Sequence, residues 1–310
     1  MIDQSTINNL LKILVCPVCK SNVVFENEKL FCKNRHCDLE FPIIDDIPIM
    51  LPELSKDFEL TQKKWNEEYK NYYSLETINL ASDPEINDTY CHVNKYLKSK
   101  KGLFLEAGCG PARLSFLLAK EGIKTVGIDF SLNALLIARN LFKRERLSGS
   151  FVCGDVLRMP FRENIFSFSY TGGVLEHIRD VQGAVNDIFR CLASGGFTTN
   201  TVPHVSLTTP YRMIQWGNIP DIPGLRSVIE FTEVEVLKGK RMRFGYEKSF
   251  TMRKIKSIFS NVGFKNVEAG LFKTYYPLEA VPSGSLKRII TITANSSRFF
   301  WPMIYVNGEK

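Results

Sequence analysis

Four cysteines near the start of the chain have the spacing of metal ligands. Cys16 and Cys19 form a Cys-x2-Cys pair, and Cys32 and Cys37 follow as a Cys-x4-Cys pair. Two thiolate pairs on two turns can close a tetrahedral site of four sulfurs, which suits zinc. His36 is a competing fourth ligand, and four buried free thiols are the alternative without metal. If zinc is bound, protein atoms fill every position, so its role is structural.

A glycine-rich loop and two carboxylates have the residue types that bind a nucleoside. Residues 106–112 read Glu-Ala-Gly-Cys-Gly-Pro-Ala before a helical pattern, so the backbone can turn sharply and approach a ligand. Asp129 ends a later apolar run, where a carboxylate can accept hydrogen bonds from ribose hydroxyls. Asp155 follows a third run and can accept a hydrogen bond from an adenine amino group. The loop lacks the third glycine of a nicotinamide dehydrogenase fingerprint, which argues against that class.

These residues follow short apolar runs that alternate with segments of helical periodicity. The predicted strands cover residues 103–107, 125–128, 150–153, 165–171, 197–202, 265–271 and 302–306. The predicted helices cover residues 112–121, 132–146, 181–192, 251–262 and 285–300. This alternation predicts an α/β fold with a seven-stranded, mostly parallel, doubly wound sheet. Ligands bind at the carboxyl ends of such strands, so the loop and the carboxylates should meet at one edge.

Composition divides the chain into three parts. Residues 1–54 hold the four cysteines and a predicted hairpin, and residues 55–83 read as a charged, aromatic, helical linker. Residues 84–310 form the large domain. Within it, residues 203–249 break the rhythm with four prolines and a basic run at 238–243, so we expect an inserted functional element there.

The large domain resembles the class I S-adenosylmethionine (SAM)-dependent methyltransferases, which have a Rossmann-like fold. The resemblance is strong from Lys101 to Val202, where it rests on the loop LEAGCGPA, the strand end VGID, the turn GDV and the segment GGVLEHI. The later elements YEKSFT and VGF match more loosely. The resemblance implies an enzyme that uses SAM as its methyl donor.

The resemblance also assigns contacts to SAM. It implies these cofactor-binding residues: Glu106, Gly108, Gly110, Asp129, Phe130, Asp155, Val156 and Thr171. Glu106, Gly108 and Gly110 match the loop at the amino-acid part of SAM, and Asp129 and Phe130 match the ribose region. Asp155 and Val156 match the adenine site, and Thr171 begins the segment that faces the methyl group. Ala112 departs from the family, because many members have a third glycine there. We expect the alanine to favour the helix start slightly.

The N-terminal segment from Leu14 to Leu51 resembles the zinc-ribbon-like activator subunit of tRNA and protein methyltransferases. The carrying feature is FPIIDDIPIML, and the family's fourth cysteine lies four positions before the aromatic residue, which selects Cys37 over His36. Some bacterial members lack the cysteines. A ribosomal RNA guanine methyltransferase family also has an N-terminal zinc ribbon, and its CxxxH ending is similar to Cys32–His36.

His177 is the candidate general base. Methyl transfer to a hydroxyl or an amine requires loss of a proton, and His177 lies just beyond the fourth strand, near the expected methyl position. A structural histidine that bonds the backbone at a helix start is the alternative. His204, directly after the fifth strand, is a second candidate.

Composition constrains the partners. Hydrophobic residues make up 44% of the 310-residue chain and charged residues 24%, and we expect a cytoplasmic protein without a transmembrane segment or signal peptide. Residues 203–310 hold 16 Lys and Arg against 8 Asp and Glu. This excess fits a phosphate-bearing acceptor or another anionic partner, and a solvated basic face is the alternative. The segment 16–51 is acidic, so we expect it to pack on the basic last third or on another subunit.

Three functions remain open from the sequence. The first is methyl transfer to a hydroxyl or amine of a small molecule or a glycan precursor, which the LEH segment and the insert favour. The second is methylation of ribosomal RNA or tRNA, with the ribbon reading the nucleic acid; the acidic balance of the ribbon argues against it. The third is a SAM-binding scaffold without catalysis. The core of the large domain should not depend on the ribbon.

Overall fold

The computed structural model describes residues 4–52, 56–72, 84–97, 99, 101–237, 240, 242, 245–272 and 284–310. Residues 73–83 of the expected linker and most of the basic run 238–243 lie outside the described residues. Within the described residues, no helix is both long and apolar enough to cross a membrane.

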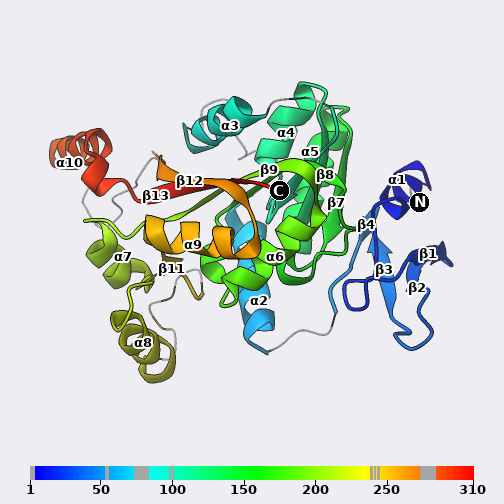
Figure 1. Ribbon diagram of the computed structural model, residues 1–310, viewed down its shortest axis with the longest axis horizontal. Helices are drawn as coiled ribbons and strands as arrows, with labels where there is room; N and C mark the ends of the chain where they lie inside the picture. Colours follow the sequence, from blue (N-terminus) through cyan, green and yellow to red (C-terminus); the bar gives the residue numbers. More distant parts are fainter. Residues whose placement is uncertain are drawn as a thin grey trace.

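A seven-stranded sheet forms the centre of the molecule, as predicted (Figure 1). Its strand order is β12-β13-β9-β8-β5-β6-β7, and the five strands from β9 to β7 are parallel, while β12 and β13 are antiparallel to their neighbours. The strands are β5 (Leu103–Ala107), β6 (Lys124–Asp129), β7 (Gly149–Cys153), β8 (Phe166–Gly172), β9 (Leu192–Pro203), β12 (Lys265–Phe272) and β13 (Met303–Glu309).

Helices cover both faces of this sheet. On one face lie α3 (Pro84–Tyr96), α4 (Arg113–Lys120) and α5 (Leu132–Arg144); on the other lie α6 (Val181–Cys191) and α9 (Met252–Val262). Side chains alternate along a strand, so Phe104 packs with α3 and α4, while its neighbour Leu105 packs in the cluster that contains α6 and α9. Both side chains are almost fully buried.

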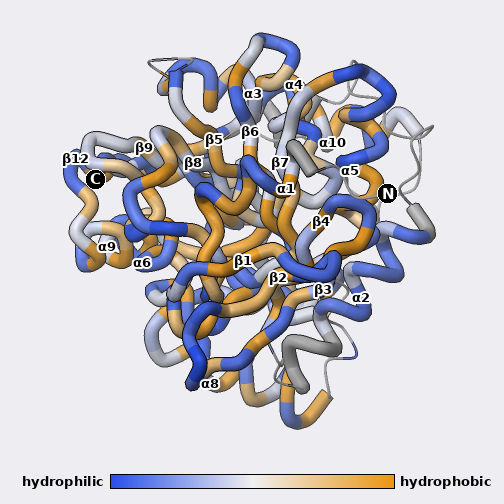
Figure 2. The backbone as a smooth tube through the Cα atoms, turned by 90° about the vertical axis from the view of Figure 1, so that its right-hand side faces the viewer, coloured by the Kyte–Doolittle hydropathy of each residue, from blue (hydrophilic) through white to orange (hydrophobic). Residues whose placement is uncertain are grey.

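The N-terminal module is a small sheet beside the edge strand β7. It contains α1 (Gln4–Leu11), β1 (Val23–Glu26), β2 (Lys29–Cys32), β3 (Glu40–Ile44) and β4 (Ile47–Pro48), in the order β1-β2-β3-β4, and includes the predicted hairpin. The N–H of Met50 donates to the carbonyl of Cys153 at 2.7 Å, and the N–H of Val15 donates to the carbonyl of Pro160 at 2.8 Å. Figures 1 and 2 show the module against this edge of the large sheet.

The module and the large sheet share one apolar core, which corrects the expectation that the two cores are independent. Leu14, Phe41 and Met50 of the module belong to the same buried cluster as Val126 and Val152 of the sheet. The module therefore buries part of its apolar surface against the sheet, because so small a unit cannot bury enough by itself.

The module packs within the chain, as expected, but the ion pairs of its described residues are not with the basic last third. Its acidic side chains instead meet α5: Asp46 lies 3.2 Å from both Arg139 and Lys143, and Asp45 lies 3.5 Å from Arg139. The charge complementarity is local, so the net charges of whole segments did not predict the contact.

The region after β9 adds several short elements around the carboxyl edge of the sheet. They are α7 (Thr209–Trp216), β10 (Ile219–Pro220), α8 (Leu225–Glu230), a π-helical segment η3 (Phe231–Val236) and β11 (Lys248–Ser249). The helix predicted over 285–300 is divided into α10 (Ser285–Ser296) and the 3-10 turn η4 (Arg298–Phe300). Ser297 between them has extended backbone angles, in keeping with the weak helix propensity of Asn-Ser-Ser.

Candidate functional site

The glycine loop folds back over the end of the neighbouring strand β6. The N–H groups of Gly108 and Cys109 both donate to the carbonyl of Ile128, at 2.7 and 3.0 Å. Gly108 has a φ of 73°, and a Cβ built there would lie 2.0 Å from Cγ2 of Val174. Only glycine fits this position, because the backbone is left-handed and the segment after β8 passes directly beside it.

Ala112 corrects one expectation from the sequence. It is the N-cap residue of α4 and has left-handed backbone angles, φ 54° and ψ 41°, with a fully buried side chain. An alanine in this conformation costs about 1 kcal/mol relative to glycine, so it does not favour the helix start. The glycine found in many family members is the residue that this backbone prefers.

Glu106 and Asp129 are buried carboxylates at the ends of β5 and β6. Oε2 of Glu106 accepts a hydrogen bond from the N–H of Ser115 at 2.8 Å, and burial raises the pKa of Glu106 to about 7. Asp129 accepts hydrogen bonds from the N–H groups of Gly110 and Ser131, both at 2.8 Å. Burial raises the pKa of Asp129 to about 6, and these donors oppose the rise.

The remaining expected cofactor residues lie at the ends of the next strands. Asp155 caps the 3-10 turn η1 (Val156–Arg158), with Oδ1 accepting from the N–H of Leu157 at 2.8 Å, and burial raises its pKa. Thr171 is fully buried at the end of β8, and its hydroxyl has no hydrogen-bond partner among the described residues. An unpaired hydroxyl of this kind is available to a ligand.

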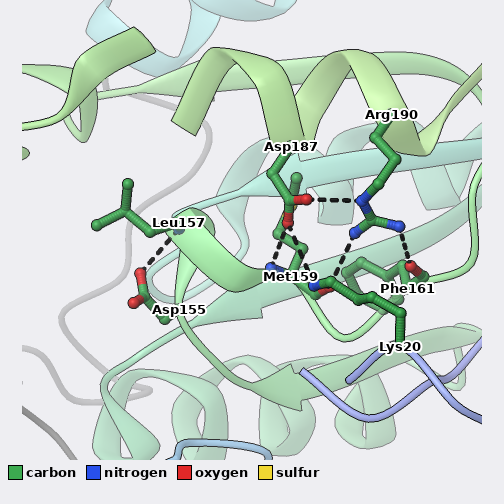
Figure 3. A network of polar contacts seen from close by, with 7 residues as sticks. All are labelled: Lys20, Asp155, Leu157, Met159, Phe161, Asp187 and Arg190. Atoms are coloured by element: carbon green, nitrogen blue, oxygen red, sulfur yellow. Dashed lines mark hydrogen bonds and ion pairs between the residues drawn. The ribbon is translucent and has the colours of Figure 1, made fainter. Parts of the chain in front are cut away.

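A polar network ties the Asp155 loop to α6 and to the module (Figure 3). Oδ1 of Asp187 on α6 lies 2.6 Å from Nε of Arg190, and the guanidinium of Arg190 donates to the carbonyls of Phe161 and Met159 at 2.6 and 3.0 Å. Lys20, in the loop after Cys19, donates to the same Met159 carbonyl at 3.0 Å. The loop that holds Asp155 is therefore braced from both sides.

His177 ends the 3-10 turn η2 (Leu175–His177), beyond β8. Its Nδ1 lies 2.7 Å from the carbonyl oxygen of Tyr246. A carbonyl only accepts, so Nδ1 carries the hydrogen and Nε2 keeps its lone pair in the neutral ring. Burial lowers the pKa of His177 below its usual value, which keeps the ring neutral at pH 7. The backbone bond of the structural alternative thus exists, and it also fixes which ring nitrogen carries the hydrogen.

Glu176 is a buried carboxyl that sequence reasoning missed. Burial, with a further contribution from Glu247, raises the pKa of Glu176 to about 8. Its Oε2 has no hydrogen-bond partner among the residues that the structure describes. At neutral pH this carboxyl stays protonated, so it can donate a hydrogen bond but is a poor base, in contrast to His177 beside it.

Helix α2 (Lys56–Tyr72) confirms the helix predicted for the linker, but it also covers the site, which the sequence did not predict. Nε2 of Gln62 donates to the carbonyl of Phe130 at 2.8 Å, and Oγ of Ser131 donates to Oδ1 of Asn66 at 2.6 Å. The ring of Trp65 meets His177 edge-on with centroids 5.7 Å apart. The helical spacing of residues 62, 65, 66 and 69 was the available signal, because such positions share one helix face.

Tyr69 completes this face of α2. A Cβ built on Gly110 would lie 2.8 Å from its hydroxyl, and its ring stacks on Trp65 with centroids 5.7 Å apart. Helix α2 thus meets the glycine loop, the end of β6 and the His177 segment together. These three parts are the expected positions of the amino-acid, ribose and methyl groups of SAM.

His204 lies apart from this cluster, at the end of β9. Its backbone N–H donates to the carbonyl of Pro302, and burial and Arg212 lower its pKa. Among the described contacts, none joins His204 to His177 or to the glycine loop. The second candidate base is therefore not in the group of residues that the structure brings together.

The four cysteines of the module converge as predicted. Sγ of Cys16 lies 3.7 Å from that of Cys37, Sγ of Cys19 lies 3.4 Å from that of Cys32, and all four sulfurs lie within 4.8 Å of one another. Zn–S bonds of about 2.3 Å in a tetrahedron separate sulfurs by about 3.8 Å, so this donor set fits zinc. His36 is exposed and outside the cluster, which settles the alternative in favour of Cys37.

Comparisons with known proteins agree with this architecture. A family model described as a methyltransferase domain matches residues 105–199, and one described as Trm112p-like protein matches residues 8–46. A UPF0434 protein of Nitrosococcus oceani is 48% identical over 52 residues, which are 16% of this chain and 85% of that protein. A ubiquinone biosynthesis O-methyltransferase of Coxiella burnetii is 25% identical over 144 residues, which are 46% of this chain and 58% of that enzyme.

The chain spans 57% and 58% of the length of two curated relatives that it matches. Among solved structures, a chain from the complex between the Haloferax volcanii Trm112 methyltransferase activator and a methyltransferase has a TM-score of 0.52 at 14% identity, covering 79% of this chain and 96% of that chain. Haemonchus contortus phosphoethanolamine N-methyltransferase 2 has a TM-score of 0.55 at 16% identity, covering 85% and 61%. Both likenesses show the fold. The chain thus contains a methyltransferase domain with a Rossmann-like fold behind a Trm112p-like module.

Proposed function

We propose that the chain transfers a methyl group from SAM to a hydroxyl or an amine of a small molecule or a glycan precursor, with His177 as general base. The observation that carries the proposal is the orientation of His177. The Tyr246 carbonyl fixes its Nδ1–H, and the burial that lowers its pKa leaves Nε2 ready to accept a proton at neutral pH.

The cofactor assignment rests on residues gathered at the carboxyl ends of four parallel strands. We assign Glu106, Gly108 and Gly110 to the amino-acid part of SAM, and Asp129 with Phe130 to the ribose. When bound, SAM supplies an electrophilic methyl group on a sulfonium. The carboxylate of Asp129 still has lone pairs beyond the two that its backbone donors use, so it can accept from ribose hydroxyls.

The adenine and methyl ends of the cofactor follow on the next strands. We assign Asp155 and Val156 to the adenine, since one Asp155 oxygen caps η1 and the other has no hydrogen bond among the described residues. Thr171 carries the unpaired hydroxyl at the end of β8 and belongs to the methyl-facing segment. Helix α2 lies over this side through Gln62, Trp65 and Asn66, and a covering element shields the polar contacts beneath it from water.

Cations around Tyr246 support an acceptor that carries a phosphate or another anionic group. Nζ of Lys248 and the guanidinium of Arg179 lie 5.5 and 5.3 Å from the Tyr246 ring. Arg226, which donates to the Tyr246 hydroxyl at 3.3 Å, is already paired with Asp221 and Glu230, so the first two cations carry the argument. The backbone of this same tyrosine orients His177. Burial lowers the pKa of Lys248 to about 8, so a bound anion would restore its full positive charge.

The experiment is incubation of the purified protein with isotope-labelled SAM and host extract, followed by mass spectrometry of separated fractions. We expect label in a low-mass or glycan-precursor fraction, and its loss in Asp129→Asn, which serves as the cofactor-site control. Label confined to RNA would contradict the proposed acceptor class. SAM binding without label in any fraction would contradict catalysis and favour a scaffold.

A further inference from the structure

Large apolar side chains are exposed on α7, on α10 and on the turns beside them. Figure 1 shows these two helices at the end of the molecule opposite the N-terminal module. We call these side chains the apolar end; their exposed fractions run from 37% to 76%. Its members are Leu207, Ile214, Leu286, Ile289, Ile290, Ile292 and Phe299. The surfaces of soluble proteins routinely expose single apolar residues, but a large group of them is typical of a contact surface.

Helix α10 supplies most of this surface and buries little of itself. All of its described side chains are at least partly exposed. A helix of 12 residues rich in Ile and Thr is marginal in water, because it is short and β-branched side chains lose rotamer freedom. Leu286, Ile289 and Ile290 have the i, i+3, i+4 spacing of one helix face, so the apolar side chains form a stripe.

The other members lie on segments that neighbour α10 or one another. The N–H of Leu207 donates to the carbonyl of Phe299 at 3.2 Å, which joins the loop before α7 to η4. Arg212 on α7 donates to the carbonyl of Pro302. Figure 1 shows α7 and α10 together at this end of the molecule.

Positive charge accompanies the apolar side chains. Residues 284–308 contain Lys287, Arg288 and Arg298 and no Asp or Glu. On the helical wheel of α10, Lys287 and Arg288 lie outside the apolar stripe, so their long side chains can reach an anionic layer while the stripe is buried.

We propose that the apolar end docks on an anionic membrane surface, with α10 lying in the plane of the lipid headgroups. An apolar stripe flanked by cations is the pattern of a helix that lies in such an interface. A second copy of the chain fits less well. A two-fold contact would place this patch against itself, and the cations would then meet without a compensating acid in residues 284–308.

The position of the apolar end relates docking to the site. Met303, the first residue of β13, pairs with Pro203, the last residue of β9, so η4 and α10 precede β13 at the carboxyl edge of the parallel strands. The glycine loop and His177 lie at the same edge. If the proposed function holds, docking brings the acceptor site near molecules carried in the membrane, although the docking itself does not depend on that function.

The test is co-sedimentation of the full chain with phosphatidylcholine vesicles, with and without phosphatidylglycerol. We expect binding to the anionic vesicles only, weakening as salt rises, because each cation near the surface contributes about fivefold to the partition coefficient. Ile289→Glu should lower binding about tenfold or more, since it places a charge in the stripe. Arg288→Glu should lower it by more than the fivefold of a neutralised cation.

The matched control is Ile44→Glu, which changes an exposed aliphatic residue of β3 in the N-terminal module. It should bind vesicles as the wild type does. SAM calorimetry without vesicles checks that each variant is folded and keeps this test separate from that of the proposed function. The proposal is overturned by wild-type protein that ignores anionic vesicles, by equal losses in Ile44→Glu and Ile289→Glu, or by a dimer that Ile289→Glu abolishes without any lipid binding.

Discussion

Burial decides what the titratable side chains of this site can do. His177, Glu176 and Asp129 have ordinary residue types, but the same loss of solvent shifts them in different senses: the pKa of the histidine falls, and those of the two carboxyls rise to about 8 and about 6. At neutral pH the consequence is a neutral imidazole, a protonated Glu176 and a largely ionised Asp129. At the same edge of the sheet, the neutral imidazole can accept a proton, the protonated Glu176 can donate a hydrogen bond, and the ionised Asp129 can accept one.

The first prediction concerns His177. Replacing it with Asn should lower kcat by about 10²–10⁴-fold while SAM affinity stays unchanged, because the base acts on the acceptor and not on the cofactor. In the wild type, kcat should be level above about pH 6.5 and fall only below the lowered pKa, where the ring becomes protonated. Steady-state kinetics across pH, with calorimetry of SAM binding, measure both effects. If His204→Asn lost kcat to this extent while His177→Asn kept the wild-type kcat, His204 and not His177 would be the general base.

The second prediction concerns Asp129. SAM should bind its ionised form, so wild-type affinity should weaken by up to about tenfold per pH unit below about 6, as the carboxylate takes up a proton. Asp129→Asn should cost about 1.5–3 kcal/mol of binding at pH 7.5, the range for hydrogen bonds to a charged group. It should also remove the part of the pH dependence that comes from Asp129, while Glu106, whose pKa is about 7, keeps its own contribution. Calorimetric titrations that show the same affinity in both proteins would reject the ribose assignment.

Helix α2 covers the loops at the carboxyl ends of the parallel strands. It follows the N-terminal module in the chain, yet its polar face bonds to Phe130 and Ser131 at the end of β6, and Trp65 reaches His177. The Trp65 ring packs against His177, and the amides of Gln62 and Asn66 hold the helix to the cofactor side by hydrogen bonds.

The third prediction tests this cover. Asn66→Ala removes the acceptor of the Ser131 hydroxyl and should weaken SAM binding by about 1 kcal/mol, close to fivefold, because the helix is held less firmly over the site. Glu67→Ala, on the exposed face one residue further, should change nothing. The measurement is the SAM dissociation rate by stopped flow together with the equilibrium affinity. Equal affinities in all three proteins would mean that α2 is only a linker.

At the scale of the whole molecule, the module and the catalytic sheet form one folded body. Leu14, Phe41 and Met50 share a buried cluster with strands of the large sheet, and Lys20 bonds the loop that carries Asp155. The adenine end of the expected cofactor site therefore depends on contacts with the module. A shared core of this kind couples the stability of the two parts.

The fourth prediction is that metal loss destabilises the whole chain. Cys32→Ser should release zinc, lower the melting temperature by about 5–10 °C or more, and weaken SAM binding, because structural zinc contributes several kcal/mol of folding free energy. Cys91→Ser, which changes an exposed cysteine on α3, is the matched control. Elemental analysis and scanning calorimetry give the readouts. Two separate transitions, with the SAM-sensitive one unshifted, would contradict a shared core.

Much of the architecture could be read from the sequence because its signals are local. Apolar runs and helical periodicity located all seven strands of the large sheet, and the Cys-x2-Cys and Cys-x4-Cys spacing located the sulfur cluster. Ala112 shows the limit of such reading. Alanine by itself favours a helix, which is a local preference. In the folded loop, however, Ala112 has a left-handed conformation, and Gly108 of the same loop lies directly beside Val174.

By itself, the sequence determined the strands, the glycine loop, the carboxylates at strand ends and the sulfur ligands, since periodicity and spacing act over a few residues. The tertiary structure alone decided that α2 covers the site, that the acidic side chains of the module meet α5, and that α10 leaves its apolar side chains exposed. It also decided the protonation of Glu176 and His177. These features depend on residues far apart in the chain, and burial and electrostatic interactions arise only when folding brings those residues together.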